Sequence, residues 1–244
     1  PIISFRFLFL EIKSNKSFIS SIKNLIINAH ILFQKSDWIH FSYATLAIRR
    51  ENVPFAIKAK SSVSFRGYDI NLYPFKDKDC YKLLWDRIDQ VHSISDDLYK
   101  KALYLGLSKK VPFKKICPGI DTNYFRSSVK FSINKPIRFL SVGRLDWIKG
   151  YEYAIKAIYH LIEKKYNIEY HIVGEGDYKE SIIFAIKQFN LEKNIILKGS
   201  LSSEKVKEAM EWADIYIQPS IEEGFCNSVL EAQSIGLPCI VSNA

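Results

Sequence analysis

The sequence predicts an α/β protein made of two domains, each built around an open parallel sheet. From Ile137 onward, short apolar runs alternate with stretches of helical periodicity, which is typical of βαβ units around a parallel sheet. Before that point, the segment Pro118–Pro136 is rich in Pro, Gly, Asn and Ser and separates the two halves. We therefore place the domain boundary near Lys130, between residues 1–130 and residues 131–244.

The elements of the second half follow from its periodicity. The apolar residues of Tyr151–Lys165 recur at helical spacing, so this segment should be an amphipathic helix that faces the sheet. The same reasoning predicts further helices at Tyr178–Phe189, Ser203–Trp212 and about Ser228–Ile235. The expected strands are Ile137–Val142, Ile168–Val173, Ile195–Leu197, Ile215–Gln218 and Cys239–Val241.

The first half is less regular but similar in kind. Two open α/β domains joined by a linker predict a ligand cleft between them, because open parallel sheets bind ligands at the carboxyl ends of their strands. The expected strands are Trp38–Phe41, Phe55–Ala59, Val63–Phe65 and Val91–Ile94. The expected helices are Phe18–Phe33, Tyr81–Asp86 and Asp96–Leu105.

Composition excludes several classes of protein. The four cysteines are scattered, which argues against a disulfide scaffold or a zinc site. Lysines and arginines interrupt every apolar run before it reaches the roughly 20 residues of a membrane span, so we interpret the chain as cytoplasmic. The net charge is +9, but the lysines are scattered. We interpret most of them as a solvated surface, ahead of peripheral contact with an anionic membrane and ahead of nucleic acid.

One candidate site lies between the first strand of the second half and the helix that follows it. Gly143, Arg144 and Lys149 stand where a strand end meets a helix N-terminus, a place where backbone N–H groups and the helix dipole favour phosphate. An arginine fork and a lysine charge could together neutralise a diphosphate. The alternative, an ordinary solvated loop with two surface cations, has about equal weight for this segment alone.

A second candidate site contains two carboxylates, Glu223 and Glu231, with seven residues between them. The first lies in a glycine-containing loop and the second in the following helix, so both can face one ligand. Carboxylates accept hydrogen bonds from sugar hydroxyls, and the N–H groups of Asn227, Ser228 and Val229 can meet a phosphate at the helix start. The alternative is a dipole-stabilising glutamate, which fits Glu231 less well because a helical turn precedes it.

These segments carry a family resemblance. Gly143-Arg144 with Lys149-Gly150, the Val173-Gly174-Glu175-Gly176 turn, and Glu223-Gly224-Phe225 with Leu230-Glu231-Ala232 resemble the donor-binding domain of family 4 glycosyltransferases. The resemblance implies a GT-B fold, with a nucleotide-diphosphate sugar as donor substrate, no metal and no cofactor. It implies that residues 1–130 form the acceptor-side domain and residues 131–244 the donor-binding domain, both partial, since the chain resembles a family member truncated at both ends.

The resemblance also assigns roles to residues. Arg144 and Lys149 would stabilise the departing diphosphate, Glu223 would contact the transferred sugar, and Glu231 would hold the ribose. The leaving phosphate itself would accept the proton of the acceptor, so retention needs no dedicated base. The other donor-binding residues are Gly143, Gly174, Glu175, Gly224, Phe225, Asn227, Ser228, Val229 and Arg66, the last standing where the family usually has histidine.

The expected function is hexosyl transfer to a glycan or lipid-linked hydroxyl in cell-envelope polysaccharide or glycolipid biosynthesis, in the cytoplasm or at the inner membrane face. Two other classes stay open. A sugar-nucleotide epimerase on the same fold would need no acceptor, and a truncated noncatalytic module would bind nucleotide sugars or anionic surfaces without turnover. His40 lies where the family often has a histidine pair, but we interpret it as a hydrogen-bonded strand-end residue rather than a catalyst.

Overall fold

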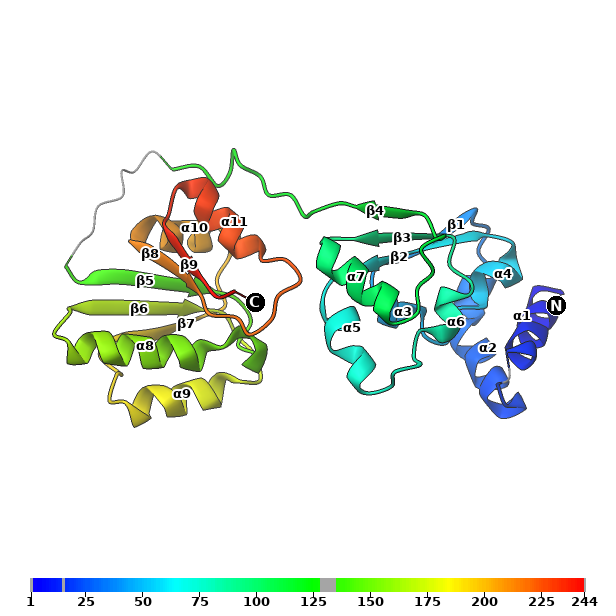
Figure 1. Ribbon diagram of the computed structural model, residues 1–244, viewed down its shortest axis with the longest axis horizontal. Coiled ribbons are helices and arrows are strands. Elements are labelled where there is room, and N and C mark those ends of the chain that lie inside the picture. The colour runs from blue at the N-terminus through cyan, green and yellow to red at the C-terminus, as the bar shows by residue number, and fades with distance from the viewer. Residues whose placement is uncertain (1, 15, 128–134, 244) are drawn as a thin grey trace. The chain divides into compact units, whose positions relative to one another are not determined.

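The computed structural model describes residues 2–14, 16–127 and 135–243. The chain divides into two compact units, Pro1–Pro118 and Gly119–Ala244, each with its own parallel sheet (Figure 1). The predicted boundary residue, Lys130, lies outside the described residues. The expected α/β class with two parallel sheets is confirmed.

The first unit is built on a parallel sheet whose strands follow one another in chain order, β1-β2-β3-β4. Its strands are β1 (Trp38–Phe41), β2 (Lys60–Phe65), β3 (Gln90–Ser93) and β4 (Phe113–Lys115). Its helices are α1 (Ile2–Lys13), α2 (Phe18–Leu32), α3 (Ala44–Ala47), α4 (Val53–Ile57), α5 (Tyr68–Asn71), η1 (Tyr73–Phe75), α6 (Lys82–Trp85) and α7 (Asp96–Tyr104).

One predicted element of this unit is wrong. Phe55–Ala59 was expected to be a strand, but the chain there forms helix α4. Pro54 stands in the first helical turn, where its fixed φ and missing N–H are tolerated, and Lys58 ends the helix with a φ of 65°. A short apolar run fits either structure, and burial of α4 against Phe7 and Leu32 decides for the helix.

The second unit has the strand order β7-β6-β5-β8-β9, all parallel. The predicted strands and helices are found within a few residues of their expected bounds. The strands are β5 (Ile137–Val142), β6 (Ile168–Val173), β7 (Ile195–Gly199), β8 (Ile215–Gln218) and β9 (Cys239–Val241). The helices are η2 (Trp147–Lys149), α8 (Tyr151–Glu163), α9 (Lys179–Gln188), α10 (Ser203–Trp212) and α11 (Asn227–Ile235).

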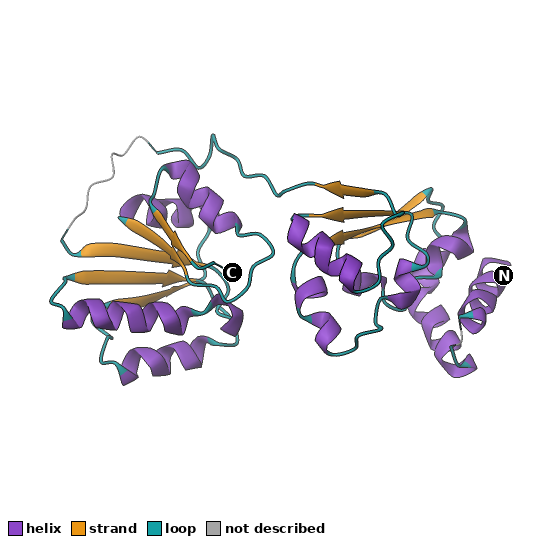
Figure 2. Cartoon of the chain, in the orientation of Figure 1, coloured by secondary structure: helices purple, strands orange, loops and turns teal. Residues whose placement is uncertain are grey.

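Helices cover both faces of this second sheet, as Figure 2 shows. Phe139 of β5 packs with Ile155 of α8 and Ile182 of α9 in one buried cluster. Its neighbour Leu140 points to the opposite face and packs with Met210 of α10 and residues of α11 in another. Because successive strand residues point to opposite faces, a strand buried on both sides is mostly apolar, as the adjacent Phe139 and Leu140 of β5 illustrate.

A chain of polar side chains crosses the sheet of the first unit. His40 Nδ1 lies 2.8 Å from Ser62 Oγ, and His40 Nε2 lies 3.0 Å from Ser64 Oγ. Ser64 Oγ also lies 2.7 Å from His92 Nδ1, and His92 Nε2 lies 3.0 Å from the carbonyl oxygen of Ile116. Both ring nitrogens of His40 are therefore hydrogen-bonded, which confirms its interpretation as a strand residue with satisfied polar groups.

The row of hydrogen-bonded side chains around His40 predicts that the stability of the fold decreases at acidic pH. Since the carbonyl of Ile116 can only accept, His92 carries its proton on Nε2 when neutral and Ser64 donates to its Nδ1. Burial, followed by the nearby His92 and Arg66, lowers the pKa of His40. The unfolded chain thus binds a proton more readily, so the free energy of unfolding should fall as pH drops through 6.5, the ordinary histidine value.

The measurement is urea unfolding of the wild type and of His40→Gln at several pH values. The variant should lose less stability on acidification than the wild type does. Parallel pH profiles for the two proteins would show that His40 does not contribute to the acid sensitivity.

Candidate functional site

The first part of the site is the turn between β5 and α8. Gly143 follows β5, and the chain then forms the short 3-10 helix η2, which ends at Lys149. Asp146 caps this helix by accepting a hydrogen bond from the N–H of Ile148 at 3.2 Å. Gly150 then adopts a φ of 62° and starts α8. The cap and the glycine fix the direction in which the Lys149 side chain leaves the turn.

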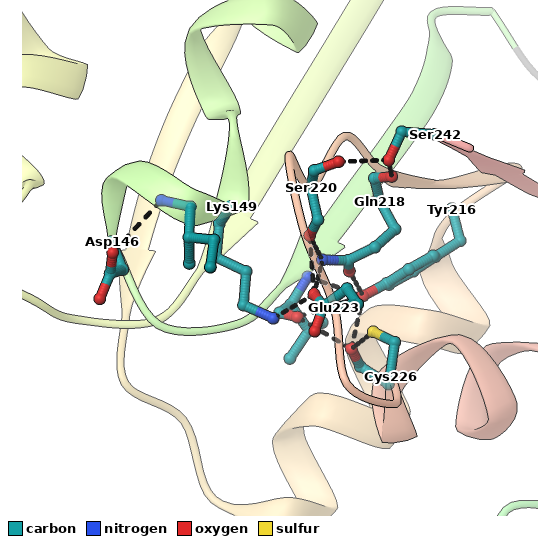
Figure 3. A network of polar contacts seen from close by, with 11 residues as sticks. Asp146, Lys149, Tyr216, Gln218, Ser220, Glu223, Cys226 and Ser242 are labelled. Carbon is teal, nitrogen blue, oxygen red and sulfur yellow. Dashed lines mark hydrogen bonds and ion pairs between the residues drawn. The ribbon is translucent and has the colours of Figure 1, made fainter. Parts of the chain in front are cut away.

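Lys149 reaches the loop between β8 and α11 and forms an ion pair with Glu223 (Figure 3). Its Nζ lies 2.5 Å from Glu223 Oε1, and only 15% of the lysine side chain and 21% of the glutamate side chain are exposed. The same oxygen accepts hydrogen bonds from Ser220 Oγ at 2.7 Å and from Gln218 Nε2 at 3.2 Å. Two residues of separate predicted motifs thus share one network.

The network continues into the sheet through Tyr216 (Figure 3). The tyrosine hydroxyl lies 2.9 Å from Gln218 Oε1 and 2.8 Å from Ser228 Oγ in the first turn of α11. Ser228 in turn donates to the carbonyl oxygen of Val142 at 3.0 Å. Burial raises the pKa of Tyr216 well above its ordinary value, so the hydroxyl keeps its proton and stays a hydrogen-bond donor. The start of α11 is therefore tied to the end of β5.

Ser242, which follows β9, closes the network from the other side. Its backbone N–H donates to the carbonyl oxygen of Gln218 at 3.1 Å, and its hydroxyl donates to the carbonyl oxygen of Ser220. The loop that carries Glu223 is thus held by the residue that follows the neighbouring strand β9.

Glycines allow the site loops to approach one another more closely than any other residue would. Gly174 has a φ of 144°, and a Cβ built on it would lie 1.9 Å from the carbonyl oxygen of Gly143. A Cβ on Gly176 would lie 2.3 Å from the carbonyl oxygen of Leu145. These contacts explain why both turn positions need glycine, whether or not a ligand binds there.

The turn after β5 also contacts the loop after β8 directly. A Cβ on Gly150 would lie 2.3 Å from the carbonyl oxygen of Pro219. The N–H of Ile221 donates to the carbonyl oxygen of Ile148 at 2.8 Å. Together with the Lys149–Glu223 pair, these contacts join the two loops along their length.

Two cavities of the second unit contain predicted site residues. One, of about 230 Å³, is lined by Glu223, Phe225 and Val229, together with Cys226 and Ser242. The other, of about 360 Å³, is lined by Arg144, Trp147 and Tyr178 among others. Lys149 and Arg144 were expected to act on one diphosphate, but Arg144 is exposed and lines a different cavity from the one beside Glu223.

The remaining predicted residues have different surroundings. Glu231 lies on α11, and partial burial of its carboxyl raises its pKa; no described side chain donates a hydrogen bond to it. Glu175 forms an exposed ion pair with Lys179, the two atoms being 3.0 Å apart. Asn227 is exposed at the first residue of α11, and Gly224 lies in the preceding loop. Arg66 belongs to the first unit, where its N–H donates to Asp69.

Sequence reasoning missed the residues that support the site. Tyr216, Gln218, Ser220 and Ser242 bind to one another or hold the Glu223 loop, yet none was predicted to have a role. One sequence feature could have identified Gln218 and Ser220. They are polar and follow an apolar run at the carboxyl end of a parallel strand, where open sheets bind ligands.

Comparison with known proteins decides the family. Residues 125–244 match the family model described as glycosyl transferases group 1. Residues 125–244 belong to the group 1 glycosyl transferases. The residues matched include both loops of the Lys149–Glu223 network, and the expected family is confirmed.

Similar proteins extend this result over most of the chain. Protein CapJ of Staphylococcus aureus is 29% identical over 95% of this chain and 61% of its own length. The amylovoran biosynthesis glycosyltransferase AmsK of Erwinia amylovora is 28% identical over 84% of this chain and 52% of its own length. This group 1 chain therefore spans less than two thirds of the length of these curated relatives.

Solved structures confirm the GT-B fold. HepE from Anabaena, crystallised with UDP and glucose, superposes with a TM-score of 0.72 over 92% of this chain and 63% of its own length, at 17% identity. At this identity the likeness shows the fold alone. None of the helices in the described part of this group 1 chain combines the length and the apolar character needed to span a bilayer.

Proposed function

We propose that this group 1 chain binds a nucleotide-diphosphate sugar on its second unit and transfers the sugar, with retention, to a hydroxyl of a cell-envelope glycan or glycolipid. The observation that carries the proposal is the Lys149–Glu223 pair. A cation and a carboxylate lie in contact beside the first turn of α11, where N–H groups favour phosphate. That combination suits a ligand with a diphosphate next to a hydroxyl-rich ring.

The pair also indicates how the contacts of Lys149 and Glu223 would change when the donor binds. Glu223 neutralises Lys149, and Ser220 and Gln218 donate to the same carboxylate oxygen. A diphosphate brings its own negative charge, so Lys149 can turn to it while Glu223 keeps its two other donors and accepts a hydrogen bond from a sugar hydroxyl. Lys149 then stabilises the charge that builds up on the departing diphosphate, which is the main electrostatic contribution expected of the site.

The relatives support the class of acceptor. AmsK is named for amylovoran biosynthesis, and WcaL of Escherichia coli, 28% identical over 82% of this chain, is named as a putative colanic acid biosynthesis glycosyltransferase. HepE was crystallised with UDP-glucose as well as with UDP. A hexose carried by UDP is accordingly the first donor to examine.

The test is a thermal-shift screen of UDP, GDP and ADP sugars against this chain and its Glu231→Ala variant. A ligand that binds only the folded state raises the unfolding midpoint, by an amount that corresponds to about 2.7 kcal/mol when its concentration is a hundred times its Kd. One nucleotide should raise the midpoint of the wild type, and the shift should be smaller in the variant, whose half-buried carboxyl we propose holds the ribose.

Product analysis completes the test. Sugar should leave the nucleotide in the presence of a glycan acceptor, whereas an epimerase would convert the nucleotide sugar without one. If no nucleotide sugar shifts the midpoint of a chain that still unfolds cooperatively, the proposed donor site is wrong.

A further inference from the structure

A buried tyrosine hydroxyl near the Lys149–Glu223 pair has no hydrogen-bond partner. Tyr151 is the first residue of α8, and its ring packs in the core of the second unit with only 1% of the residue exposed. Among the residues that the structure describes, none forms a hydrogen bond with its hydroxyl oxygen. A buried polar group without a partner destabilises a fold, and native proteins contain few of them. Packing of the ring therefore explains the aromatic side chain but not its hydroxyl.

The hydroxyl lies against Gly143, at the turn after β5. A Cβ built on Gly143 would lie 3.1 Å from the hydroxyl oxygen of Tyr151, and 3.7 Å and 3.9 Å from Cε and Cδ of Lys149. The hydroxyl and the aliphatic stem of the lysine thus meet at one point beside the glycine. The hydroxyl oxygen has almost no surface that water can touch, so a water molecule cannot take the place of the missing partner while these groups stay where they are.

The lysine stem is the movable part of this arrangement. Gly143 is fixed in the backbone, where its N–H donates to the carbonyl oxygen of Val173 at 2.9 Å. Lys149 instead reaches Glu223 through a long side chain (Figure 3). Turning the ammonium group from Glu223 to a diphosphate also moves Cδ and Cε, because the lysine stem is flexible. The motion that we propose for donor binding would thus uncover the hydroxyl of Tyr151.

The uncovered hydroxyl would act as a hydrogen-bond donor. Burial above all raises the pKa of Tyr151, and the nearby Glu223 carboxylate adds to the effect, so the phenol keeps its proton at neutral pH. A donor is strongest toward an acceptor that carries negative charge. In a nucleotide-diphosphate sugar the oxygens with that charge belong to the diphosphate, which is also the part that we assign to Lys149.

We propose that Tyr151 is a further donor-binding residue of this site, whose hydroxyl donates a hydrogen bond to the diphosphate once Lys149 has turned toward it. The assignment rests on the proposed function, since it needs a nucleotide-diphosphate ligand. The unpaired hydroxyl is a cost to the folded protein that the ligand removes. Affinity for the ligand should therefore depend on this hydroxyl, whereas stability of the fold should not.

The experiment compares Tyr151→Phe with Tyr170→Phe, each of which removes one hydroxyl and leaves the ring. Tyr170 lies in the same core and is equally buried, but its hydroxyl lies 2.7 Å from Ser141 Oγ and is hydrogen-bonded to it. Tyr170→Phe should lower the midpoint of urea unfolding, because this bond is lost. Tyr151→Phe should keep or raise the midpoint, because the removed hydroxyl has no partner in the fold.

Isothermal titration with UDP, GDP and ADP measures the binding of each protein. A nucleoside diphosphate that binds the wild type should bind Tyr151→Phe about tenfold to a hundredfold more weakly, which is the range for one hydrogen bond to a charged group. The same ligand should bind Tyr170→Phe as it binds the wild type. The glucose derivative of that nucleotide should show the same loss in Tyr151→Phe.

The outcomes separate this assignment from the proposed function. Equal affinity of the wild type and Tyr151→Phe would overturn the assignment and leave the donor site standing. A lower unfolding midpoint in Tyr151→Phe would also overturn it, since the hydroxyl would then have a partner in the fold. A loss with the nucleotide sugar but not with the diphosphate would place the hydroxyl at the sugar and contradict the diphosphate contact. No binding of any of the three diphosphates to the wild type would overturn the proposed function together with this assignment.

Discussion

Lys149→Ala should lower the turnover of sugar transfer by about a hundredfold to a thousandfold, because it removes a charge that, in the function we propose, acts on the departing diphosphate. The ion pair with Glu223 is largely buried, so some loss of stability accompanies the change. That loss should be limited to about 1–2 kcal/mol, since Ser220 and Gln218 still donate to the Glu223 carboxylate. The expected signature is thus a protein that folds but transfers poorly.

The measurement is steady-state kinetics with the nucleotide sugar that stabilises the wild type, together with a urea unfolding curve of the same preparation. Lys207→Ala is the matched control, because Lys207 is also ion-paired, to Glu211 on α10. The control should keep its turnover. Wild-type turnover in Lys149→Ala would remove the lysine from the mechanism, and a loss of turnover that merely follows the unfolded fraction would reduce it to a structural role.

Gly174→Ala should be the most destabilising single substitution in the site. The residue has a φ of 144°, which a side chain disfavours, and the new Cβ would lie 1.9 Å from the carbonyl oxygen of Gly143. Backbone strain and overpacking each cost about 1–3 kcal/mol, so we expect a loss of roughly 3 kcal/mol or more. Relief of the clash must push the Gly143 turn, and Lys149 beyond it, away from the β6 strand end.

Urea unfolding measures the loss, with Gly119→Ala as control, because a Cβ on Gly119 would meet no atom within 4 Å. The control should stay within about 0.5 kcal/mol of the wild type. If Gly174→Ala keeps wild-type stability but no longer binds nucleotide, the glycine serves the ligand directly and the structural explanation is wrong.

The second unit could be predicted closely from the sequence because its strands are buried on both faces. The run Ile137–Val142 is mostly apolar, and the helix that follows has one apolar face, so the two elements differ in period. The first unit offered weaker signals. The run at Phe55–Ala59 had no period of its own, and α1 was missed because its apolar residues surround the whole helix.

The site could be predicted as a set of residues but not as an arrangement. Arg144, Lys149 and Glu223 were identified from their motifs, yet the pairing of Lys149 with Glu223 joins residues 74 positions apart, and no local pattern encodes it. The separation of Arg144 from that pair follows from the η2 turn, whose capped geometry directs the Lys149 side chain toward the β8 loop.

The contact between Gly150 and Pro219 bears on how such proteins can change their donor. The turn after β5 and the loop after β8 share a backbone hydrogen bond, a glycine contact and an ion pair, so neither can be reshaped alone. A chimaera that takes one of these loops from a relative should fold poorly, whereas exchanging both as a unit should preserve the fold. A change of donor specificity in this unit would then require the turn after β5 and the loop after β8 to change together.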